Sequence, residues 1–254
     1  MDIQVSNHVF LRVKKSPNPK ASIWLIHGFG ESGLCYKEAF SSKLCNAFDL
    51  YAVDLPGFGV SPAQNSCQNI AGTAQVLRTV IQELSQNQPL IFIGHSMGGI
   101  IGTALCKMFP NQVQYFFSVE GNLTKADTFL SKLTLDYNDP SKFYDFYIKK
   151  IYKKLESGDP VMHCYYASVR FCDPQTLLSM GRSCYEETGE TKAGEEFNQL
   201  NCKKLYLWGD QSTPKETFVF IQEKKIPNYC FKGSHHWPML DNTQAFYEKI
   251  LESL

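Results

Sequence analysis

Gly94-His95-Ser96-Met97-Gly98 is the stretch that decides the fold of this chain. The apolar residues 89–93 before it predict a buried strand, and residues 100–108 after it predict a helix. A sharp turn between such a strand and helix needs small residues, because the central serine is strained and the helix packs close to the strand. We expect the turn to lift the Ser96 hydroxyl above the sheet and to aim the helix N-terminus at whatever Ser96 attacks.

The composition limits which classes of protein this chain can belong to. The 254 residues include 25 basic and 25 acidic side chains, so the charge balance favours neither a nucleic-acid nor an acidic-membrane partner. The first twenty residues are polar and hold no apolar signal core, and no apolar run is long enough for a membrane span. The nine cysteines include no C-x-x-C pair and are expected to be reduced thiols, mostly buried. These features predict a cytoplasmic protein.

Strands and helices alternate along most of the chain, which predicts an α/β fold with a mostly parallel central sheet and helices on both faces. Strands are expected at residues 8–14, 22–26, 49–54, 89–93, 114–119, 203–208 and 228–232. Helices are expected at residues 36–48, 70–84, 100–108, 218–225 and 243–251.

The pattern changes between residues 123 and 201, where aromatic and charged side chains increase and no strand is predicted. We interpret this region as a helical cap inserted into a single domain of residues 1–254, whose core comprises residues 1–122 and 202–254. The aromatic side chains of the cap either pack it against the core or line a substrate site, and the sequence leaves both interpretations open.

Four motifs together resemble the α/β-hydrolase superfamily, and the resemblance extends from His8 to the end of the chain. They are His27-Gly28-Phe29-Gly30, Asp54-Leu55-Pro56-Gly57-Phe58-Gly59-Val60-Ser61, Gly94-His95-Ser96-Met97-Gly98-Gly99 and His235-His236-Trp237-Pro238. The resemblance implies that Ser96 is the nucleophile and that the backbone N–H groups of Phe29 and Met97 form the oxyanion hole. It aligns the catalytic base with His236, directly before the aromatic residue, and leaves His235 as the alternative; His27 and His95 occupy positions that are usually structural.

The acid of the triad is the least defined member. Most relatives place it three residues after the glycine that follows the second-last strand, and here that position holds Ser212, which is not a carboxylate. Certain haloalkane dehalogenases place the acid after the preceding strand, a position that corresponds to Glu120. A carboxylate that ends a buried strand needs a partner, so we expect Glu120 to be the acid, with Asp210 as the alternative.

These residues predict a serine hydrolase that cleaves a carboxylic ester of a small, largely apolar substrate through an acyl-enzyme. A thioesterase or a C–C bond hydrolase would use the same triad. A third interpretation is a ligand-binding homologue without catalytic activity. The intact serine and histidine argue against it. The sequence contains no metal-ligand spacing and no dinucleotide fingerprint, so no cofactor is expected, and it leaves the oligomeric state open.

Overall fold

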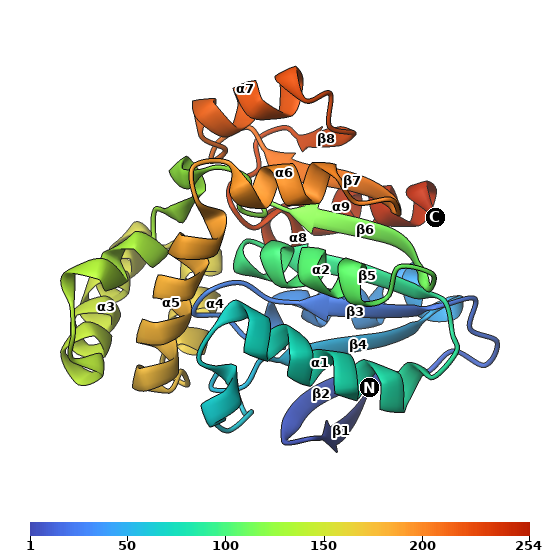
Figure 1. Cartoon of the computed structure of the whole chain (residues 1–254), viewed down its shortest axis with the longest axis horizontal. Coiled ribbons are helices and arrows are strands. Elements are labelled where there is room, and N and C mark those ends of the chain that lie inside the picture. The colour runs from blue at the N-terminus through green and yellow to red at the C-terminus, as the bar shows by residue number, and fades with distance from the viewer.

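The central sheet has eight strands in the order β1-β2-β4-β3-β5-β6-β7-β8, in a computed structural model that describes residues 1–254 (Figure 1). The strands β4, β3, β5, β6, β7 and β8, which are neighbours in this order, run parallel. The strand β2 pairs antiparallel with both β1 and β4. Their bounds are β1 (Asp2–Ser6), β2 (Val9–Lys14), β3 (Ser22–Ile26), β4 (Asp49–Asp54), β5 (Leu90–His95), β6 (Val113–Val119), β7 (Lys203–Gly209) and β8 (Asn228–Phe231). The prediction of a mostly parallel α/β sheet is confirmed.

Helices pack on both faces of this sheet (Figure 1). The helices α1 (Ile70–Ser85) and α2 (Met97–Met108) cover one face, and α9 (Thr243–Ser253) lies on the other with α8 (Pro238–Asp241). The helix α7 (Lys215–Glu223) connects β7 to β8. The strands β3, β4 and β5 are buried at every residue, as expected for parallel strands that are covered on both faces.

One prediction about local structure was wrong, and one strand was missed. Residues 36–48 form no α-helix, because two 3₁₀ segments, Gly33–Ser41 and Lys43–Asn46, meet at Ser42. Ser42 is extended, and its hydroxyl accepts a hydrogen bond from the Leu44 backbone N–H, which starts a new segment. The strand β1 was not predicted, because its side chains are mostly exposed and it pairs with only one neighbour, at the edge of the sheet.

The segment between β6 and β7 contains no strand. Its longer helices are α3 (Pro140–Lys154), α4 (Pro160–Val169), α5 (Pro174–Thr188) and α6 (Lys192–Asn198). A proline follows an aspartate cap at the start of α3, α4 and α5, where the missing N–H has no intrahelical partner to lose. In Figure 1 the helices α3, α4 and α5 stand beside the carboxyl ends of the strands, so this segment can cover a site there.

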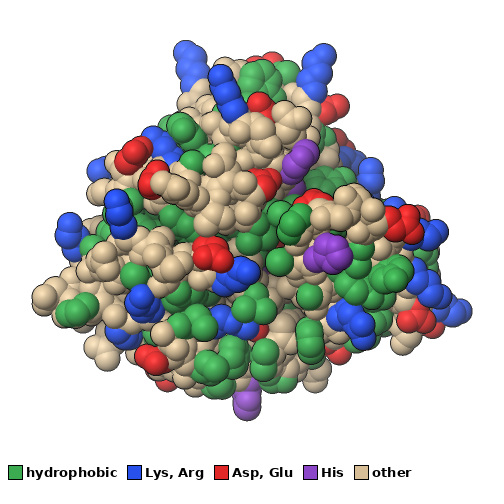
Figure 2. Space-filling model, turned by 180° about the vertical axis from the view of Figure 1, so that it is seen from behind, with side chains coloured by type: hydrophobic (Ala, Val, Ile, Leu, Met, Phe, Trp, Pro, Cys, Tyr) green, Lys and Arg blue, Asp and Glu red, His purple; other side chains and the backbone are tan.

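The charged side chains and the cysteines are distributed as the composition predicts. On the face shown in Figure 2, basic and acidic side chains are interspersed, and neither sign forms a large patch. None of the nine cysteines forms a disulfide, and most of them are buried. None of the helices combines the length and the apolar character that a membrane-spanning helix requires.

Candidate active site

Ser96 lies at the junction of β5 and α2, in a backbone conformation that few side chains adopt (φ = 50°). Its N–H donates to the Val119 carbonyl at 2.9 Å, which ties the turn to the neighbouring strand β6. A Cβ atom on Gly94 would lie 2.2 Å from the Gly98 carbonyl oxygen, and one on Gly98 would lie 2.4 Å from that of Ile26. Both glycines are therefore needed for the close approach of the helix to the strands.

The loop after β3 fixes the peptide group between Gly28 and Phe29. The Gly28 carbonyl accepts hydrogen bonds from His27 Nδ1 at 2.8 Å and from the Glu31 backbone N–H at 3.3 Å. His27 Nε2 accepts from the Leu55 N–H at 3.0 Å, so the proton of this ring resides on Nδ1. Burial lowers the pKa of His27, which keeps it neutral. Because N–H and C=O point in opposite directions across a trans peptide, these bonds orient the Phe29 N–H.

His236 follows β8 and contacts Glu120 at the end of β6. Its Nδ1 lies 3.2 Å from Glu120 Oε2, and both side chains are buried. The other carboxylate oxygen, Oε1, accepts from the Gly209 N–H at 2.6 Å and from the Thr213 hydroxyl at 2.8 Å. Glu120 also has a positive φ of 46°. The ends of β5 and β6 thus each hold one non-glycine residue in a strained conformation, and both residues belong to this site.

The surroundings of His236 favour its neutral form. Burial lowers the pKa of His236, the charge of His95 lowers it further, and the hydrogen bond to Glu120 opposes both effects. Since Nδ1 faces a carboxylate, the ring proton resides there and leaves the lone pair of Nε2 free. A neutral imidazole with a free Nε2 can accept a proton from a hydroxyl group.

The side chains of the other residues considered for the acid and the base make no hydrogen bond to His236 or Glu120. Asp210 is exposed and accepts from the Gly233 N–H at 2.7 Å and from Gln211 Nε2 at 3.0 Å, with no bond to His236. His235 is exposed, and its backbone N–H donates to Asp241. The hydroxyl of Ser212 is buried without a hydrogen-bond partner and does not line the pocket around Ser96.

A buried network that the sequence analysis missed lies beside His236. Glu31 accepts from the Gly28 N–H at 2.6 Å, from His95 Nδ1 at 2.9 Å and from the Trp237 indole N–H. Burial alone would raise the pKa of Glu31, but the charge and hydrogen bond of His95 lower it to about 2. The available signal was its position, since Glu31 directly follows the glycine-rich loop at the end of a central strand.

His95 carries a positive charge in this network. Its Nε2 lies 2.7 Å from the His236 carbonyl oxygen, which can only accept, and its Nδ1 faces the ionised Glu31. Both ring nitrogens therefore donate. The pKa of His95 is raised, because the charge and hydrogen bond of Glu31 outweigh the effect of burial.

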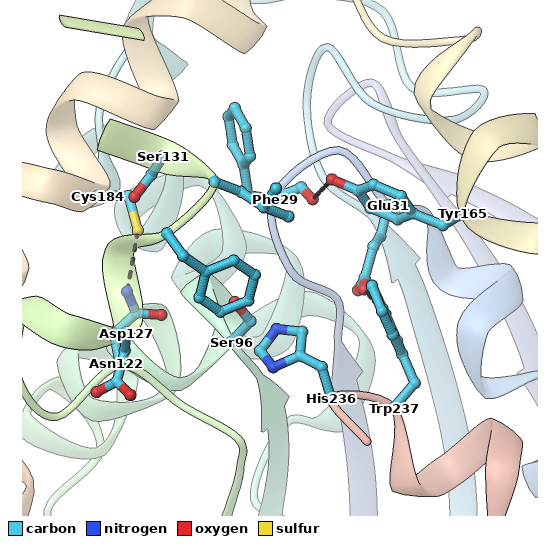
Figure 3. A pocket seen from close by; sticks show the side chains of 12 residues that line it. Phe29, Glu31, Ser96, Asn122, Asp127, Ser131, Tyr165, Cys184, His236 and Trp237 are labelled. Atoms are coloured by element: carbon cyan, nitrogen blue, oxygen red, sulfur yellow. Dashed lines mark hydrogen bonds between the residues drawn. The ribbon is translucent and has the colours of Figure 1, made fainter. Parts of the chain in front are cut away.

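Ser96 and His236 line one small pocket with a cavity volume of about 10 Å³, which is room for about one water molecule. Figure 3 shows the imidazole of His236 beside Ser96, with Glu31, Tyr165 and Trp237 on one side and Asn122, Asp127, Ser131 and Cys184 on the other. Tyr165 donates to the Phe29 carbonyl at 2.9 Å, which joins α4 to the loop after β3. A larger cleft of about 360 Å³ shares Glu31, Tyr165 and Trp237 with this pocket, but neither Ser96 nor His236 lines it. No cluster of three or more His, Cys, Asp or Glu residues is placed to hold a metal ion.

A family model described as the alpha/beta hydrolase fold matches residues 22–163, which is more than half of the chain. This chain belongs to the α/β-hydrolase fold family. The hydrolase is 26% identical over 231 residues to the pimeloyl-[acyl-carrier protein] methyl ester esterase of Legionella pneumophila, covering 87% of this chain and 90% of that one. The prediction of an esterase-like hydrolase is thereby confirmed at the level of the family.

Solved structures share the fold of this hydrolase at low sequence identity. An N-acyl homoserine lactonase superposes with a TM-score of 0.77 at 15% identity, covering 99% of this chain and 94% of that one. A thermophilic esterase from Thermogutta terrifontis superposes with a TM-score of 0.74 at 17% identity, covering 96% and 93%.

Proposed function

We propose that this hydrolase cleaves a carboxylic ester of a small substrate through a triad of Ser96, His236 and Glu120. The observation that carries the proposal is the placement of His236. Its ring shares a pocket with the strained Ser96, and its Nδ1 is hydrogen-bonded to the buried Glu120. One carboxylate oxygen of Glu120 orients the imidazole. The other oxygen accepts hydrogen bonds from the Gly209 N–H and the Thr213 hydroxyl.

The reaction proceeds in two acyl transfers. Ser96 Oγ forms a bond to the carbonyl carbon while His236 Nε2 takes its proton, and the same proton passes to the alcohol as the ester C–O bond breaks. A water molecule then attacks the acyl carbon and gives its proton to His236. The acid leaves, and the proton returns to Ser96. Glu120 stabilises the imidazolium that forms in each step.

The oxyanion of each step is bound by the backbone N–H groups of Phe29 and Met97. Met97 is the first residue of α2, where backbone N–H groups have no intrahelical partner. The Phe29 N–H is oriented by the bonds that His27 and Glu31 make to the Gly28 carbonyl. Loss of one such donor typically raises the barrier by about 3 kcal/mol.

One further observation supports an ester as the substrate. The curated relative from Legionella pneumophila acts, by its name, on the methyl ester of a pimeloyl group carried by acyl-carrier protein. The cap segment (residues 123–201) contributes Phe129, Leu130 and Tyr165 to the pocket around Ser96.

Hydrolysis of p-nitrophenyl acetate and butyrate tests the proposal, together with covalent labelling by a fluorophosphonate. We expect the wild type to hydrolyse the esters and to be labelled at Ser96, and Ser96→Ala to lose both properties. Ser212→Ala is the matched control and should keep both, since Ser212 does not line the pocket. Full activity of Ser96→Ala would overturn the proposal. Acyl-CoA thioesters with the same acyl groups show whether thioesters are preferred.

A further inference from the structure

One wall of the pocket beside Ser96 is polar. Asn122, Asp127, Ser131 and Cys184 lie together on this side, opposite Tyr165 and Trp237 (Figure 3). Asn122 is 5% exposed and follows Glu120 by two residues at the end of β6.

Asn122 Oδ1 accepts no hydrogen bond from the protein, and among the side chains that line the pocket it is the only buried nitrogen or oxygen atom without a hydrogen-bond partner. The orientation of the amide follows from its neighbours. Thr188 Oγ1 donates its proton to the Cys184 carbonyl at 2.6 Å, so toward Asn122 it can only accept. The amide nitrogen, Nδ2, therefore faces Thr188 Oγ1 at 3.2 Å and also donates to Cys184 Sγ at 3.8 Å. In Figure 3 Oδ1 lies on the side of the amide that is nearer to Ser96.

A buried hydrogen-bond acceptor without a donor raises the free energy of the folded protein, so a bound group that donates to it is favoured. The carboxylates of the pocket already have donors. Glu31 is bonded to Gly28, His95 and Trp237, and Asp127 accepts from the backbone N–H groups of Leu123 and Thr124 and from the hydroxyl of Thr217. The free acceptor is thus a neutral amide oxygen, which a neutral donor matches without bringing an unpaired charge into a buried site.

We propose that Asn122 is a specificity-determining residue, whose Oδ1 accepts a hydrogen bond from a hydroxyl or amide N–H group that the ester carries near its carbonyl. This inference rests on the proposed function and names the substrate class of the same site. A substrate that lacks the donor leaves Oδ1 unpaired when the pocket is filled. Sites built around a hydrogen-bonding group discriminate strongly against analogues without it.

Matched ester pairs test this role. One pair is p-nitrophenyl 3-hydroxybutyrate and 3-methylbutyrate, in which a methyl replaces the hydroxyl. A second is p-nitrophenyl N-acetylglycinate and 4-oxopentanoate, in which a methylene replaces the N–H. A third, 2-hydroxyethyl butyrate and propyl butyrate, places the donor on the alcohol. For at least one pair the wild type should prefer the donor-bearing ester in kcat/KM by about 5- to 150-fold.

The variant Asn122→Leu should reduce that preference to about threefold or less, while keeping hydrolysis of the apolar ester. Ser131→Ala changes the same wall, leaves Asn122 Oδ1 in place and should keep the preference. The inference is overturned if the wild type prefers no donor-bearing ester, a result that requires no variant to fold. It is also overturned if the preference survives in Asn122→Leu. Ser96-dependent hydrolysis without any preference would leave the proposed function standing, whereas Ser96-independent hydrolysis would remove it.

Discussion

His95 Nε2 donates to the carbonyl oxygen of His236 at 2.7 Å. The residue before the proposed nucleophile thus holds the backbone of the proposed base. Through its other ring nitrogen, His95 is paired with Glu31, which also accepts from the Gly28 N–H and from Trp237. One buried ion pair therefore connects the turn at Ser96, the loop that carries Phe29 and the loop that carries His236, so the positions of all three depend on it.

The variant Glu31→Gln should lower the free energy of unfolding by about 3 kcal/mol at pH 7, because it leaves the charge of His95 buried without a counterion. Urea unfolding measures this difference. The exposed pair between Lys107 and Glu196 supplies the control, since Glu196→Gln should change stability little. An unchanged stability of Glu31→Gln would contradict the role of the ion pair.

The stabilisation by Glu31 should also depend on pH. The pKa of this carboxyl is about 2 in the folded protein, below the ordinary 4.5, so the folded state favours the ionised form. Its contribution is complete above pH 4.5 and is lost as the pH falls toward 2. The stability difference between wild type and Glu31→Gln should therefore shrink over this interval in unfolding curves. A difference that grows on acidification would reverse the expected sign.

Glu120→Gln should lower kcat by about 10²- to 10⁴-fold, because an amide cannot stabilise the imidazolium and can hold the wrong tautomer. Asp210→Asn should stay within about twofold of the wild type, since Asp210 is exposed and does not contact His236. Steady-state kinetics with p-nitrophenyl butyrate measure both. The reverse result, with Asp210→Asn inactive and Glu120→Gln intact, would transfer the acid role to Asp210.

The pH dependence of kcat/KM should follow His236. Its pKa is lowered by burial, with a further contribution from the charge of His95, so the neutral base persists below the ordinary value of 6.5. Activity should therefore rise with pH through a midpoint below 6.5 and be close to its plateau at pH 7. Rates between pH 4.5 and 8 at constant ionic strength measure the midpoint. A midpoint above 6.5 would be inconsistent with this environment.

His27→Ala should lower kcat by about 10-fold or more with a smaller effect on KM, because the Gly28–Phe29 peptide loses the bond that orients its N–H. A boronic acid that mimics the tetrahedral intermediate should bind more weakly in proportion. His163→Ala, on the exposed side of α4, is the matched control and should behave as the wild type. Equal losses in binding of the boronic acid and of the product acid would indicate general disruption instead.

The sequence by itself determined the parallel core and the chain order of Ser96, Glu120 and His236. Buried strands and tight turns leave local signatures in apolar runs and glycines, and residues at the carboxyl ends of neighbouring parallel strands meet at one edge. Tertiary structure alone decided which carboxylate reaches His236, since Glu120 and Asp210 each follow a strand that ends at this edge. It also decided the partners of Glu31 and the unpaired oxygen of Asn122. Such contacts join residues far apart in the sequence, and no local pattern records them.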